Sequence, residues 1–191
     1  MTIKQGSIDQ LCGLYSVLNA TELLIGKYAP YDRRLRAASQ KKALFGELVA
    51  YLARKDLLEE ALTVGIDDLY MRGGPIDIAI KSVKQYQGLK MKKQRAFKGK
   101  DPATLAEYWK RLTEHLRHDD TAVIICFSSR YFGHWTCVKA ITPKELILAD
   151  SARMKRIYRN QCGIGPEEKN TNTLWPSLTY LLSIERGEAN E

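Results

Sequence analysis

The pattern of apolar residues changes near the middle of the chain, and this change constrains the fold more than any other feature. Before about residue 118 the apolar residues recur at helical spacing, whereas the later apolar segments are short and rich in residues that favour strands. The strands predicted in this second half are residues 121–127, 134–141, 145–149, 154–158 and 179–184. Helices followed by strands indicate a segregated α+β fold and not an alternating parallel sheet.

The predicted helices differ in how much of their surface is apolar. Residues 11–25 are apolar on most sides, which is typical of a helix in the middle of a core, and Gly26 is its predicted end. The segments 33–62 and 76–86, and a third opened by Asp101 as its N-cap, each carry one apolar stripe. We interpret residues 89–97 as an exposed strand and residues 163–174 as a polar segment on the surface.

Length and composition favour one globular domain. The 191 residues are 45% hydrophobic and 27% charged. We predict a single domain over residues 1–191, with a helical insertion at roughly 33–118. No apolar run is long enough to span a membrane, and no basic segment leads into an apolar one at the N-terminus. Four cysteines without a CxxC pair indicate a reducing compartment. We therefore expect a cytoplasmic protein, with delivery as an effector left open.

Three reactive side chains stand where the predicted elements begin or end. Cys12 opens the apolar helix, where the helix dipole and the free amides favour a thiolate, and Gly13 leaves room beside it. His134 begins a strand, and Asp150 ends the next strand. If these two strands form an antiparallel hairpin, His134 and Asp150 are neighbours. A thiolate, an imidazole and a carboxylate that orients the imidazole are the parts of a nucleophilic triad.

Each of these residues also has an ordinary structural interpretation. A single buried cysteine is usually a small hydrophobe, and an aspartate that closes a strand is usually a turn residue. We interpret Trp135, Cys126 and Cys137 in this ordinary way, as core packing. Because Cys126, Cys137 and His134 lack the short paired spacings of zinc ligands, we expect neither a metal nor a cofactor.

The residues around the triad resemble those of papain-like cysteine peptidases. The shared features are Gln5, Cys12-Gly13 opening a helix, Gly133-His134-Trp135 opening a strand and Ala149-Asp150-Ser151 closing its partner. The layout is most similar to that of the compact peptidases that cleave bacteriocin leader peptides after a double glycine. The resemblance covers the two ends of the chain, and residues 33–116 match no family pattern.

This resemblance implies a papain-like α+β fold, in which a helical half carrying Cys12 packs on an antiparallel sheet carrying His134 and Asp150. It implies Cys12 as nucleophile, His134 as general base and acid, and Asp150 as the group that orients the imidazole. The oxyanion hole would use the Cys12 backbone N–H and the Gln5 side chain, although Gln5 stands one residue farther from the cysteine than in that group. The expected activity is thiol-dependent hydrolysis of a peptide or isopeptide bond through an acyl-enzyme.

Two other functions stay open. The same triad could pass its acyl group to an amine, as in a transferase or amidase. The net charge of +8 could instead belong to a module that binds nucleic acid or an acidic partner. Two groups of residues carry this charge: Arg33, Arg34, Arg36, Lys41 and Lys42, and then Lys90, Lys92, Lys93, Arg95, Lys98 and Lys100. Phe97 is the only aromatic residue within the second group, which argues against a base-stacking surface. The expected partner is a protein or peptide substrate, and the charge allows an acidic one.

Overall fold

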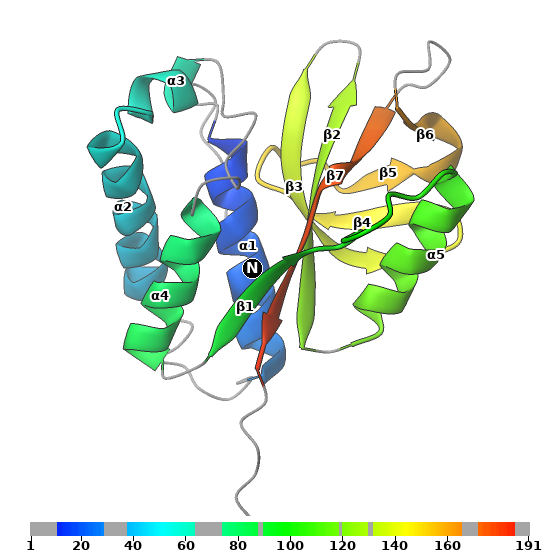
Figure 1. Cartoon of the computed structure of the whole chain (residues 1–191). Coiled ribbons are helices and arrows are strands. Elements are labelled where there is room, and N and C mark those ends of the chain that lie inside the picture. The colour runs from blue at the N-terminus through cyan, green and yellow to red at the C-terminus, as the bar shows by residue number, and fades with distance from the viewer. Residues whose placement is uncertain are drawn as a thin grey trace, which may run out of the picture.

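Helix α1 (Cys12–Tyr28) lies between two other helices and one face of a β-sheet in the computed structural model (Figure 1). The structure describes residues 11–28, 38–63, 74–87, 90–118, 120–129, 132–165 and 172–185. The other helices are α2 (Ala38–Arg54), α3 (Leu58–Thr63), α4 (Pro75–Gln87), α5 (Leu105–Leu116) and the short 3₁₀ helix η1 (Arg159–Gln161). No described helix has the length and apolar character needed to cross a membrane.

The described strands form a single seven-stranded sheet of order β1-β7-β2-β3-β4-β5, with β6 pairing to β7 off this path. All pairs along the path are antiparallel, and β6 with β7 is parallel. The strands are β1 (Met91–Arg95), β2 (Thr121–Ser129), β3 (Gly133–Ile141), β4 (Glu145–Ala149), β5 (Arg156–Tyr158), β6 (Cys162–Ile164) and β7 (Asn172–Ile184). Mixed helices and a mainly antiparallel sheet confirm the α+β prediction.

Both faces of the sheet are covered. Helix α1, backed by α2 and α4, packs on one face, and α5 packs on the other (Figure 1). The buried apolar residues form one hydrophobic cluster under α1 (the α1 cluster) and another under α5 (the α5 cluster). Along β2, Ile124 and Cys126 belong to the α1 cluster, whereas Val123 and Ile125 belong to the α5 cluster. A central strand covered on both faces is apolar at every position, which explains the continuous run in residues 121–127.

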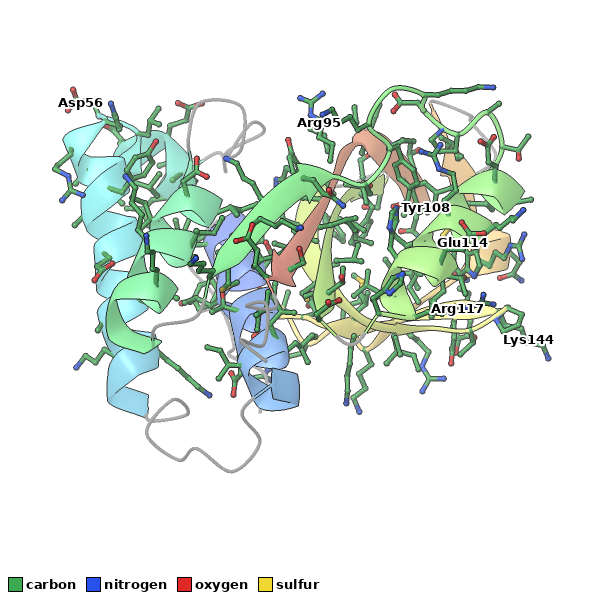
Figure 2. All side chains as sticks on the ribbon, turned by 60° about the horizontal axis from the view of Figure 1, so that its bottom comes forward. Asp56, Arg95, Tyr108, Glu114, Arg117 and Lys144 are labelled. Atoms are coloured by element: carbon green, nitrogen blue, oxygen red, sulfur yellow. The ribbon has the colours of Figure 1, made fainter. Side chains whose placement is uncertain are left out.

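A polar contact inside the α5 cluster fixes helix α5 to the sheet. Figure 2 shows Tyr108 on α5, and its hydroxyl lies 3.1 Å from the Thr179 hydroxyl on β7. Tyr108 is fully buried, so this partner satisfies a group that water cannot reach.

Two helix predictions were wrong at their boundaries. The segment 33–62 is not one helix, because α2 ends in a Schellman-type turn in which Asp56 has φ 56° and the Leu57 N–H donates to the Leu52 carbonyl (3.0 Å). Aspartate tolerates this left-handed conformation better than most residues, so the turn forms without glycine. Helix α1 does not stop at Gly26 but continues to Tyr28. A glycine inside a helix costs only about 1 kcal/mol, which the burial of Leu24 and its neighbours outweighs.

The N-terminus of α5 also differs from the prediction. Thr104, and not Asp101, is the N-cap, and its hydroxyl accepts from the Glu107 N–H (3.2 Å). The Glu107 carboxylate accepts from the Ala103 N–H (3.0 Å). A threonine followed three residues later by a glutamate is a capping-box pattern, which the sequence contained and the prediction overlooked.

The polar segment 163–174 is not a simple surface excursion. It overlaps strand β6 and the start of β7, and Leu174 is fully buried. The β2–β7 register shifts between Ile125 and Phe127, opposite the part of β7 that holds Pro176. Proline cannot donate to a strand ladder and is tolerated at such irregularities, so β7 continues through it. The strand expected at residues 89–97 is confirmed as the edge strand β1.

Candidate active site

Cys12 is the first residue of helix α1. The Leu11 carbonyl accepts the first helical hydrogen bond from the Tyr15 N–H (3.1 Å), so Leu11 occupies the N-cap position. The backbone N–H of Cys12 consequently has no acceptor within the helix, and its thiol lies at the positive end of the helix dipole. Cys12 is 9% exposed, so these partial charges act where little solvent screens them.

His134 is the second residue of β3 and pairs with Phe127 on β2. Its ring packs edge-on against Phe127, with 5.6 Å between ring centroids, and against Phe132, with 6.2 Å. His134 and Phe127 are both buried, so Phe127 and the strand restrict the orientation of the imidazole.

Asp150 follows the last residue of β4 and binds His134. Ala149 pairs with Cys137 on β3, so the antiparallel hairpin brings the end of β4 beside the start of β3, as the sequence predicted. Asp150 Oδ1 lies 2.5 Å from His134 Nε2, and Asp150 Oδ2 accepts from the Met154 N–H (3.0 Å). With both oxygens engaged, the carboxylate is fixed in position.

Cys12 lies close enough to His134 to help raise the pKa of its imidazole, although Cys12 is on a helix more than a hundred residues earlier in the chain. Nε2 of the imidazole is engaged with Asp150, so Nδ1 is the ring nitrogen that remains available for a second partner. The structure therefore brings Cys12, His134 and Asp150 together in the order thiol, imidazole, carboxylate. Packing of α1 against β3 makes this contact.

The surroundings of His134 favour its charged form. Burial lowers the pKa of His134, but the hydrogen bonds and negative charges of Asp150 and Cys12 outweigh burial and raise it from 6.5 to about 9. Burial raises the pKa of Asp150. The hydrogen bond to His134 and the attraction of its charge outweigh burial and lower the pKa of Asp150 below its ordinary value of 3.8. At neutral pH the pair is an imidazolium and a carboxylate. A thiolate beside an imidazolium can attack a carbonyl carbon and have the departing group protonated.

Thr136 is a member of this group that the sequence analysis missed. The β3–β4 register places it opposite Asp150, and it is 1% exposed. Its hydroxyl helps to lower the pKa of Asp150, although the contact falls short of full hydrogen-bond geometry and no other described residue bonds to it. A threonine in a buried strand carries no sequence signal for this role, and only its position opposite Asp150 indicates one.

The other predicted site residues lie elsewhere or outside the described part. Gln5, the expected oxyanion donor, lies outside the described residues. Trp135 packs against Tyr180, with 6.3 Å between ring centroids, which confirms its role in the core. Cys126 and Cys137 are buried in the same core cluster.

Cys162 is also buried, and burial raises the pKa of its thiol to about 12. Within the part of the chain that the structure describes, no group of three or more His, Cys, Asp or Glu side chains could hold a metal ion. A scan of protein-family models and a search of curated proteins find no match to this chain.

Proposed function

We propose that this chain is a papain-like cysteine peptidase that hydrolyses a peptide or isopeptide bond through an acyl-enzyme on Cys12. One observation carries the proposal: buried His134 binds Asp150 through Nε2, and Cys12 lies close enough to raise the pKa of the same imidazole. A buried histidine needs one polar partner to be satisfied, and a core cysteine needs none. Both partners together, with the thiol at a helix N-terminus, form the arrangement that nucleophilic catalysis requires.

The proposed reaction has two steps. In the first, the Cys12 sulfur attacks the carbonyl carbon and forms a C–S bond, while the His134 proton passes to the leaving amine as the C–N bond breaks. In the second, His134 takes a proton from water, the hydroxide oxygen attacks the thioester carbon, and the C–S bond breaks to return the thiolate. Asp150 holds the imidazole in the required orientation through both steps. The Cys12 N–H would stabilise the oxyanion in each step.

The test is to trap the acyl-enzyme with p-nitrophenyl acetate, which acylates a reactive thiolate without substrate specificity. The wild-type protein is quenched in acid and mapped by mass spectrometry, and we expect one acetyl group on Cys12. Cys126→Ser is the matched control, because Cys126 is 8% exposed against 9% for Cys12. Cys126→Ser should acylate like the wild type, whereas Cys12→Ser should lose the adduct. Acetylation of all thiols at similar rates, or none at Cys12, would contradict the proposal.

The same experiment separates hydrolysis from acyl transfer. An added small amine such as glycinamide competes with water for the thioester. If water remains the main acceptor when the amine is present, the enzyme acts as a hydrolase. If the acetyl group passes almost entirely to the amine, the transferase alternative replaces the peptidase.

A further inference from the structure

Phe132 is an exposed aromatic residue held rigidly beside His134. It keeps 48% of its surface exposed, and in the described part of the chain only Leu62 and Tyr158 are comparable large apolar residues. Its position is fixed from two sides. The Ser129 N–H donates to the Phe132 carbonyl (2.8 Å), and the ring packs edge-on against buried Phe127, with 6.3 Å between ring centroids. Phe132 is therefore a fixed apolar surface facing solvent.

The chemistry at His134 indicates what this surface meets. In the proposed reaction His134 gives its proton to the leaving amine, so that amine must lie against the imidazole. The residue on the amine side of the scissile bond therefore lies next to whatever packs on the imidazole. Phe132 packs on it, with 6.2 Å between ring centroids and an angle of 84° between the rings.

The backbone between Phe132 and His134 borders open space. Gly133 is exposed, and a Cβ built on it would meet no atom within 4 Å. This space lies on the face of the strand opposite to the imidazole, because successive strand residues point to opposite faces, whereas Phe132 and His134 lie on the same side. The exposed Phe132 ring and the His134 imidazole are in contact, so one bound segment can contact both.

We propose that Phe132 selects the substrate residue that directly follows the scissile bond, and that this residue carries an apolar side chain. The inference rests on the proposed peptidase function and adds a preference to it. Burying half of an exposed phenyl ring against an apolar side chain removes both surfaces from water. The gain applies only while the leaving segment is bound, so it acts on formation of the acyl-enzyme and not on its hydrolysis.

The experiment uses a peptide library prepared by digesting a denatured proteome. Wild-type protein cuts the library, and mass spectrometry identifies the residues on both sides of each new terminus. We expect apolar residues to be enriched directly after the cut. A peptide pair taken from these sites, with leucine or alanine after the bond, then compares kcat/KM for wild type, Phe132→Ala and Tyr158→Ala. Tyr158 is the matched control, because it is 44% exposed and lies on β5.

The expected results separate the inference from the function. Phe132→Ala should lower kcat/KM for the leucine peptide by about tenfold, should act little on the alanine peptide, and should leave acyl-enzyme hydrolysis unchanged. Tyr158→Ala should behave like the wild type. An equal loss on both peptides would show that Phe132 only positions His134, and would overturn the inference while leaving the function standing. Cleavage that does not depend on Cys12, or no cleavage, would overturn the function and the inference with it.

Discussion

Replacing Asp150 with asparagine should lower the pH at which His134 loses its charge. The asparagine side chain keeps an oxygen that can accept from Nε2, so the ring orientation is preserved while the negative charge is removed. The rise in the pKa of His134 from 6.5 to about 9 corresponds to on the order of 3 kcal/mol in favour of the charged ring. Asp150 contributes through both its hydrogen bond and its charge, and burial opposes them. We therefore expect the transition to fall by more than about one pH unit in the variant.

Two alkylating reagents measure this transition without a known substrate. Iodoacetate is an anion and is attracted by imidazolium, whereas iodoacetamide is neutral, so the ratio of their rates at Cys12 reports the charge on His134. A histidine is charged below its pKa. In the wild type the ratio should be high at neutral pH and fall as the pH rises through about 9. In Asp150→Asn the fall should occur at lower pH.

The control is Glu145→Gln, which removes a carboxylate from the other end of β4. Glu145 pairs with Arg156 (3.1 Å) and lies away from His134, so the transition should stay near that of the wild type. The ratio of the iodoacetate rate to the iodoacetamide rate could fall at the same pH in Asp150→Asn and in the wild type. Asp150 would then not control the charge of the imidazole, and the reasoning from this contact would be refuted.

Two further predictions concern groups around the site and on the surface. Thr136→Val should reduce acylation by p-nitrophenyl acetate severalfold, about 1 kcal/mol, because Asp150 loses a neighbouring hydroxyl that favours its charged form. Thr136→Ser should restore the rate. Removing exposed charge near β1 should leave this acylation unchanged but slow the capture of an acidic protein substrate at low salt, measured by stopped-flow. Lys93 is kept, because it pairs with Asp77 (2.7 Å). The residues changed to glutamine are Lys90, Lys92, Lys98 and Lys100. Equal capture rates for the wild type and this four-lysine variant would show that the surface does not steer substrates.

The contacts that could be predicted from sequence are those that local geometry determines. A hairpin brings the start of one strand beside the end of the next, so the neighbourhood of His134 and Asp150 follows from two strand boundaries. A helix that is apolar on most sides belongs inside the core, so the buried position of α1 also follows. Cys12 is the first residue of that helix, which agrees with the prediction.

Other features depend on packing that no local pattern carries. The contact of Cys12 with His134 needs α1 to lie along β3, and Thr136 gains its place only from the strand register. Phe132 is exposed although its residue type favours burial, because its backbone hydrogen bond with Ser129 holds it at the end of the β2–β3 hairpin. The polar residues that precede Leu174 concealed the start of β7, since long-range pairing with β2 overrides their weak strand preference.

Competitive alkylation of the four cysteines tests the central claim most directly. Three of them have nearly equal exposure, namely Cys12 (9%), Cys126 (8%) and Cys162 (6%), and Cys137 is fully buried. A large rate difference among these thiols then reports chemistry and not access, because the thiolate is the reactive form.

The protein is treated with limiting iodoacetamide at about pH 6, where an ordinary thiol is almost entirely protonated, and each cysteine is mapped by mass spectrometry. The account predicts that Cys12 is labelled first, that His134→Ala slows this labelling at least tenfold, and that His118→Ala, a change at an exposed histidine, does not. Unfolding should make the four rates similar. If Cys12 reacts no faster than Cys126 and Cys162, or reacts equally fast without His134, Cys12 is a packing residue and the proposed function is wrong.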